Sequence, residues 1–232
     1  MVSRETSGDG QNPLELPAWL KPATASLDRY VQILIGPGIE RGLLGPREAP
    51  RIWDRHILNC AVVADPHLGL VPTGATVADI GSGAGLPGVV WALVRPDLTV
   101  VLIESLLRRA TFLTECVQEL GLGTRVHVVR DRAESITAGP QGGRPGSVDL
   151  VTARAVAPLG TLATWAATLL GPGGSLVALK GESAGDELDR DRAALTDIGF
   201  TDMQIRQVGQ GVVDPATTVV VATLHGHRPT AQ

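Results

Sequence analysis

Apolar and polar positions follow a repeating pattern from residue 76 onward. Short apolar runs, typical of buried strands, alternate with longer segments of helical periodicity, such as residues 105–120, which stop at Gly121. The apolar runs predict strands at residues 76–80, 98–103, 125–129, 147–153, 173–180, 204–208 and 217–224. The longer segments predict helices at residues 86–95, 105–120, 157–170 and 183–198. This alternation indicates an α/β fold with a mostly parallel seven-stranded sheet and helices on both faces.

The first 70 residues have a different pattern. Residues 1–11 are small and polar, and we expect them to be disordered. Residues 12–70 are predicted to form a small helical N-terminal extension, which Pro37, Pro46 and Pro50 break into pieces. The sequence therefore predicts three parts: a disordered N-terminus (1–11), a helical extension (12–70) and a ligand-binding α/β domain (71–232).

The turn after the first predicted strand is rich in glycine. It follows Asp79 and contains Gly81, Gly83 and Gly85. The next strand closes on Glu104, and this order of strand, glycine turn, helix, strand and acid opens many nucleotide-type cofactor sites. A dinucleotide site has its third glycine one residue later, where this chain has Leu86. The spacing G-x-G-x-G after an acid is similar to the first motif of class I S-adenosylmethionine (SAM) methyltransferases.

The residue types at the turn favour SAM as the cofactor. A carboxylate such as Asp79 would repel a phosphate, whereas SAM carries a sulfonium and an amino-acid tail and no phosphate. Glu104 can accept hydrogen bonds from ribose hydroxyls in either kind of site. No G-K-[ST] follows the turn, which argues against a P-loop. A tight turn without any ligand is disfavoured, because such a turn rarely needs three glycines in five residues.

Composition narrows the possible partners and compartments. The net charge of −4 is not that of a protein that coats nucleic acid nonspecifically, so any RNA contact needs a local basic patch. Cys60 and Cys116 lie in apolar contexts away from any Cys/His cluster, and we expect no metal site. The chain has no apolar run long enough to span a membrane and no signal-peptide pattern, so we expect a cytoplasmic protein with no membrane contact.

Several longer motifs follow one another in a specific order. They are ERGLLGPREAPRIWDRHILNC, DIGSGAGLPG, ESLLRRATFL, RDRAE, DLVTARAVAPL and LLGPGGSLVALKGE. This series closely resembles the RsmG family, also called glucose-inhibited division protein B (GidB), over nearly the whole chain. The resemblance implies a class I SAM-dependent methyltransferase that transfers a methyl group to N7 of a guanine in 16S rRNA, near the decoding site of the small ribosomal subunit.

The motifs and the resemblance together define a set of expected cofactor residues. These are Asp79, Gly81, Gly83, Gly85, Leu86, Glu104, Ala133, Glu134 and Arg154. The resemblance implies that the glycine turn contacts SAM at Gly81 and Leu86. It also implies that Ala133 and Glu134 meet the adenine end, and that Arg154 lines the cofactor and substrate pocket.

The expected chemistry needs positioning groups and no general base. Guanine N7 has a free lone pair at neutral pH, so no proton has to leave the nucleophile, and orientation supplies the catalysis. Arg154 and Lys180 are the catalytic candidates, because an arginine fork can hold guanine O6 or a phosphate and a lysine can hold a phosphate. The alternatives are a structural ion pair for Arg154 and a solvated strand end for Lys180. Neither cysteine has the setting of a covalent nucleophile.

Four arginines are candidates for binding RNA, namely Arg51, Arg55, Arg108 and Arg109. Arg108 and Arg109 could instead lie on a solvated helix face. Arg47, Arg51 and Arg55 have the spacing of one helical face, although Pro50 makes a continuous helix doubtful. His56 is expected to be held by its neighbours Trp53 and Asp54. We expect a monomer that acts on 16S rRNA or the small ribosomal subunit. The alternatives are a SAM methyltransferase with a non-RNA substrate and a SAM-binding module without catalysis.

Overall fold

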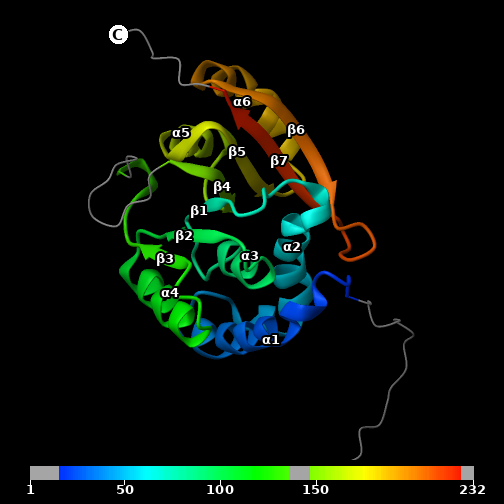
Figure 1. The fold of residues 1–232 in the computed structure, drawn as a ribbon, viewed down its shortest axis with the longest axis vertical. Helices are drawn as coiled ribbons and strands as arrows, with labels where there is room; N and C mark the ends of the chain where they lie inside the picture. Colours follow the sequence, from blue (N-terminus) through cyan, green and yellow to red (C-terminus); the bar gives the residue numbers. More distant parts are fainter. Residues whose placement is uncertain (1–15, 136–146, 226–232) are drawn as a thin grey trace, which may run out of the picture.

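A sheet of seven strands forms the centre of the protein (Figure 1). The computed structural model describes residues 16–135 and 147–225, so the segment 1–11 with its expected disorder lies outside these ranges. The strands are β1 (Thr76–Ile80), β2 (Thr99–Ile103), β3 (Val126–Val129), β4 (Val148–Arg154), β5 (Leu170–Lys180), β6 (Phe200–Val208) and β7 (Thr217–Leu224). They lie in the order β3-β2-β1-β4-β5-β7-β6, which confirms the predicted α/β fold.

The strand order reverses between β1 and β4. From β1 the chain moves outward through β2 to β3, and it then returns to the other side of β1 as β4. Strands β1 to β5 pair in parallel, whereas β7 runs antiparallel to both β5 and β6. Open sheets bind ligands beyond the carboxyl ends of their strands at such a reversal. A ligand is therefore expected beside the segments that follow Ile80 and Arg154.

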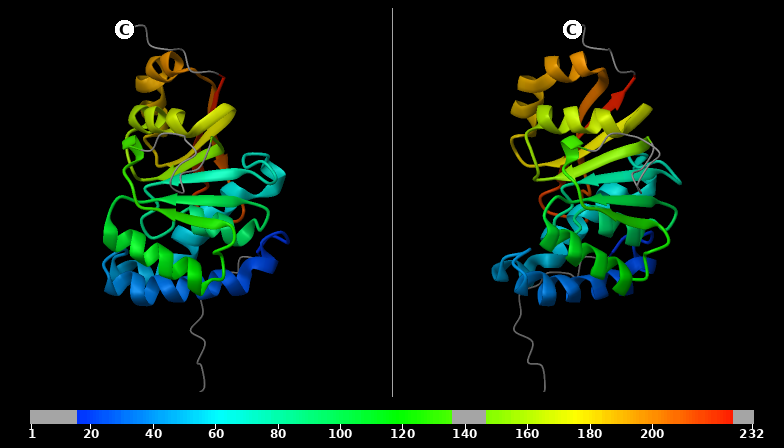
Figure 2. Two further views of the ribbon diagram at one scale, coloured as in Figure 1. Left: turned by 60° about the vertical axis from the view of Figure 1, so that its left-hand side comes forward. Right: turned by 90° about the vertical axis from the view of Figure 1, so that its left-hand side faces the viewer.

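Helices cover both faces of the sheet, as the alternating pattern predicted (Figure 2). The helices are α1 (Thr24–Ile33), α2 (Asn59–Ala61), α3 (Gly88–Val94), α4 (Leu107–Glu119), α5 (Leu159–Leu169) and α6 (Ala184–Ile198). Successive strand residues point to opposite faces, so Val77 packs with the core of α1, α3 and α4, while Ala78 packs with the core of α5 and α6. The strands are buried on both faces, which explains why they are almost continuously apolar.

The starts of β6 and β5 differ most from their predicted positions, and tertiary pairing is the reason. Helix α6 ends at Ile198 and is capped by Gly199, which has a left-handed φ of 112°. Strand β6 begins directly afterwards at Phe200, four residues before the predicted start, because Phe200 pairs with Leu224 of β7. Strand β5 likewise begins at Leu170, which pairs with Val148 of β4.

The N-terminal extension is helical, but much of it is not α-helix. Its short 3₁₀ turns are η1 (Lys21–Ala23), η3 (Pro46–Arg51), η5 (Val62–Ala64) and η6 (Pro66–Leu68), and its π turns are η2 (Leu34–Gly38) and η4 (Trp53–Leu58). A further 3₁₀ turn, η7 (Ala133–Ser135), follows β3. The doubt that Pro50 raised is justified, since a 3₁₀ turn carries Arg47 and Arg51 while a π turn carries Arg55. No single α-helical face presents these three arginines.

The extension packs into the same core as the sheet. The indole of Trp91 in α3 donates to the carbonyl of Cys60 at 2.9 Å. The buried guanidinium of Arg95 donates to the carbonyls of Ala64 and Val71. The apolar core that fills this face is continuous from Leu20 to β7, so a domain boundary near residue 70 stays a prediction. Within the described ranges, none of the helices is long and apolar enough to cross a membrane.

Candidate functional site

The glycine turn after β1 has a backbone that side chains would disfavour. Gly81, Gly83 and Gly85 have φ angles of 66°, 58° and 101°, in the left-handed region. A Cβ at Gly81 would lie 2.6 Å from a methyl carbon of Val156, and a Cβ at Gly85 would lie 2.8 Å from the hydroxyl of Tyr30. The glycines therefore allow both the turn itself and the close approach of two other segments.

The main-chain amides of the turn already donate within the protein. Those of Gly81 and Ser82 reach the carbonyl of Ile103 at 2.8 and 3.1 Å. Those of Gly85 and Leu86 reach the carbonyl of Ser82 at 2.6 and 3.2 Å. A pyrophosphate needs such amides to point at it. The turn therefore fits a ligand that lies against glycine main chain without a phosphate.

Asp79 lies beneath the turn and is fully buried. Its Oδ2 accepts a hydrogen bond from the amide of Gly88 at 3.0 Å, and its Oδ1 has no partner among the described residues. Burial raises the pKa of this carboxyl to about 7, while its hydrogen bonds oppose the rise. The carboxyl holds the start of α3. Two hollows, described below, lie beside the turn, and the Asp79 carboxyl borders neither of them. The sequence predicted that Asp79 contacts the cofactor directly, and the geometry does not support that contact.

Glu104 lies at the end of β2 and faces the turn. Its two oxygens accept hydrogen bonds from the amides of Gly83 and Leu106 at 3.0 and 2.9 Å. A carboxylate offers about four acceptor positions, so Glu104 still has capacity for ligand hydroxyls. Arg109 approaches the same carboxylate at 3.9 Å.

Two hollows meet at this carboxylate. The small hollow, of about 220 Å³, is lined by Ile80, Gly81, Ile103, Glu104, Ser105, Asp131, Arg132, Ala133, Glu134, Val156 and Trp165. The middle hollow, of about 450 Å³, is lined by Leu43, Leu44, Gly81, Ser82, Gly83, Ala84, Leu86, Glu104, Ser105, Leu106, Arg109, Arg154, Ala155 and Val156. They share Gly81, Glu104, Ser105 and Val156. The two hollows therefore lie next to each other around the glycine turn, and we call them together the cofactor cradle.

The expected cofactor residues gather around this cradle with two exceptions. Ala133 and Glu134 lie in the small hollow, and Leu86 and Arg154 lie in the middle one. The exceptions are Asp79, described above, and Gly85, which faces Tyr30 and Val89. Sequence reasoning missed Trp165, which comes from α5 and lines the small hollow. No local motif marks it, because its position depends on how α5 packs against the sheet.

Arg154 ends β4 and is bound from the N-terminal extension. Its Nη2 lies 2.8 Å from Nδ1 of His56, and its Nη1 lies 3.7 Å from Sγ of Cys60. The predicted neighbours Trp53 and Asp54 are not the hydrogen-bond partners of His56, which instead contacts Glu48 and Arg154. The following residue, Ala155, has a left-handed φ of 55°, which is uncommon for a residue with a side chain.

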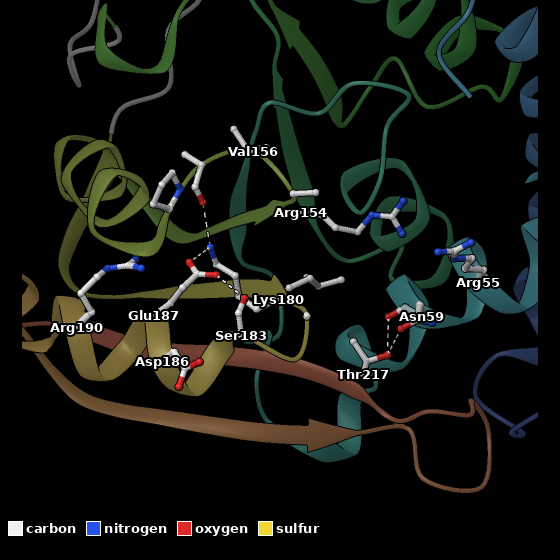
Figure 3. A pocket seen from close by; sticks show the side chains of 15 residues that line it. Arg55, Asn59, Arg154, Val156, Lys180, Ser183, Asp186, Glu187, Arg190 and Thr217 are labelled. Atoms are coloured by element: carbon white, nitrogen blue, oxygen red, sulfur yellow. Dashed lines mark hydrogen bonds and ion pairs between the residues drawn. The ribbon is translucent and has the colours of Figure 1, made fainter. Parts of the chain in front are cut away.

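A wide cleft of about 890 Å³ opens on the other side of Arg154 (Figure 3). It shares Arg154, Ala155 and Val156 with the middle hollow, so the two spaces meet at this segment. Arg154 and Arg55 extend toward the same end of the cleft in Figure 3. The cleft is large enough for a nucleotide, and it borders the cofactor cradle at this segment.

Lys180 has a different setting from either of the two that the sequence suggested. Its Nζ donates to the carbonyl of Ala157 at 2.9 Å and lies 2.7 Å from Oε2 of Glu187. The same Glu187 oxygen accepts from the amide of Leu159 at 3.1 Å. The side chain of Lys180 is 10% exposed. It is therefore a paired residue that ties β5 and α6 to the loop after Arg154.

The four arginines expected to bind RNA form two groups. Arg55 lines the wide cleft and is 3.4 Å from Glu48, while Arg51 is exposed at the end of η3. Arg108 is exposed on the first turn of α4, and Arg109 lines the middle hollow. Arg55 and Arg109 thus line different spaces of the site, whereas Arg51 and Arg108 line neither of these two spaces.

Both cysteines are buried in the core, and burial raises the pKa of Cys60 to about 11 and of Cys116 to about 12. Neither is a thiolate at neutral pH, which agrees with chemistry that needs no covalent nucleophile. In the parts of the chain that the structure describes, no group of three His, Cys, Asp or Glu residues could hold a metal ion.

Solved structures similar to this one define the class of the fold. A methyltransferase from Methanococcus maripaludis, described as a putative S-adenosyl-L-methionine-dependent enzyme, aligns with a TM-score of 0.57 at 13% identity, covering 97% of this chain and all of the other. A SAM-dependent methyltransferase from Aquifex aeolicus aligns with a TM-score of 0.53 at 19% identity, covering 78% of this chain and 99% of the other. The fold is therefore that of the class I SAM-dependent methyltransferases, as predicted.

Sequence comparison identifies the family. Residues 23–215 match the GidB family, described as rRNA small subunit methyltransferase G. Proteins named ribosomal RNA small subunit methyltransferase G include one from Salinispora arenicola, 53% identical over 82% of this chain and 77% of its own length. Another, from Mycolicibacterium gilvum, is 50% identical over 90% of this chain and 89% of its own length. The chain belongs to this family, which confirms the resemblance seen in its motifs and the prediction of a SAM-dependent methyltransferase.

Proposed function

We propose that the protein transfers a methyl group from SAM to N7 of a guanine in 16S rRNA, near the decoding site of the small ribosomal subunit. Family membership supports rRNA as the substrate. The observation that carries the proposal is the junction at Arg154, Ala155 and Val156, where the cofactor cradle meets the wide cleft. A cofactor on one side and a guanine on the other would face each other across these residues.

The residues of the cradle fit SAM. The turn presents glycine main chain whose amides are already satisfied, and Glu104 keeps acceptor capacity beside the small hollow. Ala133 and Trp165 provide apolar surface in that hollow for an adenine ring. SAM supplies an electrophilic methyl group on a sulfonium, and the protein does not have to generate one.

The protein contributes orientation to the transfer. Guanine N7 attacks with a lone pair, so no side chain has to remove a proton first, and orientation alone can contribute roughly 7–11 kcal/mol. An arginine carries five N–H donors, and two contacts of Arg154 are made within the protein, so the rest of its fork can bind O6 or a phosphate of the substrate. Lys180 acts indirectly, because its contact with Ala157 holds the loop that separates cradle and cleft.

Transfer of labelled methyl groups to isolated small subunits tests the reaction. Nuclease mapping and mass analysis should then find 7-methylguanosine in 16S rRNA. Arg154→Ala should lose most of the transfer. Arg29→Ala should not, because Arg29 pairs with Glu119 between α1 and α4 and does not line the cleft. Transfer to a protein or small molecule but not to rRNA would contradict the proposed substrate. SAM binding without any transfer would favour a non-catalytic module.

Ligand-dependent melting tests the cofactor separately. S-adenosylhomocysteine should raise the melting temperature, and NAD should not, because a ligand stabilises only the fold that binds it. A rise with NAD alone would contradict the interpretation of the glycine turn.

Docking of RNA on the arginines is the remaining part of the proposal. We infer that Arg51, Arg55, Arg108 and Arg109 contact phosphates of the rRNA. Removing one phosphate contact should lower the slope of log affinity against log salt by roughly 0.7–0.9. Arg51→Gln with Arg55→Gln should therefore flatten this slope, and Arg29→Gln is the matched control. An unchanged slope would reject this docking surface. The proposal also includes a cytoplasmic monomer, which sedimentation of the purified protein and fractionation of cells would test.

A further inference from the structure

One histidine of the N-terminal extension contacts the arginine at the junction of cradle and cleft. His56 lies in η4, and its Nδ1 is 2.8 Å from Nη2 of Arg154, which is 98 residues away in the sequence. The other ring nitrogen, Nε2, lies 2.8 Å from Oε2 of Glu48 in η3. The His56 side chain is 12% exposed. Three side chains from three segments thus form a chain of contacts that ends at the site.

The chemistry of the two partners determines the state of the imidazole. A guanidinium can only donate hydrogen bonds, so Nδ1 of His56 must accept from Arg154 and must carry no proton. A carboxylate can only accept hydrogen bonds, so Nε2 must carry the proton and donate a hydrogen bond to Glu48. The contacts are consistent only with a neutral imidazole protonated at Nε2. This arrangement fixes the direction of the whole chain.

We propose that His56, held by Glu48, is a positioning residue that keeps the guanidinium of Arg154 aimed at the substrate side of the cradle. The proposal rests on the proposed function, because Arg154 is the group there expected to hold the guanine nucleotide. The neutral ring leaves the positive charge of Arg154 available to the substrate, whereas a carboxylate in the same position would neutralise it. The N-terminal extension thereby supplies part of the active site.

This arrangement makes the contact sensitive to acid. Burial lowers the pKa of His56, and the charges of Arg154 and Arg55 lower it further, while the hydrogen bond and charge of Glu48 raise it; the net direction is downward. Protonation of Nδ1 removes the acceptor and places a positive charge against Arg154. We therefore expect methyl transfer to fall on the acid side of neutrality as His56 becomes charged.

Three substitutions at His56 separate the two contacts. His56→Asn keeps an acceptor close to the place of Nδ1 but cannot reach Glu48. His56→Gln keeps a donor close to the place of Nε2 but offers Arg154 no acceptor at Nδ1. His56→Phe keeps the ring and removes both contacts. His127→Asn, at an exposed position on β3, is the control for an unrelated histidine.

The assay measures kcat and KM for methyl transfer to small subunits as a function of pH. Loss of a hydrogen bond to a charged group corresponds to about a tenfold to hundredfold fall in kcat/KM, which we expect for His56→Phe and His56→Gln. His56→Asn should retain far more activity and lose the acid limb, because an amide does not titrate in this range. Glu48→Gln should move the acid limb to lower pH, since Glu48 raises the pKa of His56.

Some outcomes would overturn the proposal. The proposal would be wrong if His56→Phe kept the wild-type kcat/KM and an unchanged acid limb of the pH profile. Equal losses in the Asn and Gln variants would also overturn it, because the acceptor for Arg154 would then not be the property that matters. If His56→Phe fails to fold, as shown by its melting curve, the comparison of the Asn and Gln variants still decides.

A measurement of the ring itself is independent of activity. Nitrogen-15 NMR of histidine-labelled protein should show Nδ1 of His56 unprotonated and Nε2 protonated at neutral pH. Arg154→Met should raise the pKa of His56, because the guanidinium lowers it. A proton on Nδ1 at neutral pH would overturn the proposal. Failure of the unchanged enzyme to methylate small subunits, with the expected NMR result, would refute the proposed function while leaving the contact intact.

Discussion

Replacing Gly81 by alanine is the sharpest test of how the cofactor cradle is built. Gly81 borders both hollows and has a φ of 66°. A Cβ added there would lie 2.6 and 2.8 Å from the two methyl carbons of Val156, distances that real Cβ atoms essentially never show. Val156 belongs to the segment that separates the cradle from the wide cleft, so a shift of Val156 would change both spaces.

The expected cost has two separable parts. A left-handed backbone costs a non-glycine residue about 1–2 kcal/mol. Forcing extra atoms into a packed site costs about 1–3 kcal/mol. Gly81→Ala should therefore lower the free energy of unfolding by roughly 2–5 kcal/mol. The double variant Gly81→Ala with Val156→Ala lacks the two methyl groups of Val156. It should therefore recover the steric cost and keep the backbone cost.

Gly83→Ala is the matched control. Gly83 has a similar φ of 58°, but a Cβ there would meet only the carbonyl oxygen of Gly81, at 3.8 Å. It should therefore destabilise the fold by about 1–2 kcal/mol, the backbone part alone. Urea unfolding of the four variants gives the free energies, and calorimetry with SAM reports whether the cradle keeps its shape.

The double-mutant cycle decides whether the reasoning holds. We expect the costs of Gly81→Ala and Val156→Ala to combine to less than their sum by about 1–3 kcal/mol. Additivity within about 0.5 kcal/mol would refute the steric explanation. So would a Gly81→Ala variant that is no less stable than Gly83→Ala.

Three further substitutions test other contacts. Tyr30→Phe removes the 2.7 Å hydrogen bond to the carbonyl of Ala84. It should lower the free energy of unfolding in urea by about 1–3 kcal/mol and weaken SAM binding. Full SAM affinity would show that the N-terminal extension does not shape the glycine turn. Burial raises the pKa of Asp79 from 3.8 to about 7, so the native state binds more protons than the unfolded state between these pH values. The free energy of unfolding should therefore fall as pH rises from 3.8 to about 7. Asp79→Asn should lack this pH dependence, and an identical dependence in the variant would contradict the raised pKa of Asp79. Lys180→Met removes the contact with Glu187 and should lower the free energy of unfolding by about 1.5–3 kcal/mol; wild-type stability in urea unfolding would contradict the paired setting of Lys180.

The sheet and the cofactor turn were predictable because their signals are local. A strand that is buried on both faces has to be apolar along its length, so β1 and β2 were located within a residue. A backbone with positive φ strongly favours glycine, so the spacing of Gly81, Gly83 and Gly85 marked the turn and its ligand class. The alternation of strands and helices then required a parallel sheet.

The roles of individual charged side chains were not predictable, because their partners are distant in the sequence. Asp79 was expected to face the cofactor, but the packing of α3 on β1 directs it to the amide of Gly88. Lys180 was expected to bind phosphate or solvent, but the position of α6 gives it Glu187 and the loop after Arg154.

By itself, the sequence determined the fold class, the place of the cofactor turn and the family, since each depends on residues close together in the chain or on motifs in a fixed order. Only the tertiary structure decided what the N-terminal extension contributes. It brings Tyr30 to the carbonyl of Ala84 and His56 to Arg154 across 54 and 98 residues. Such contacts follow from burying one continuous apolar core, and a linear pattern specifies which residues are buried without specifying which of them meet.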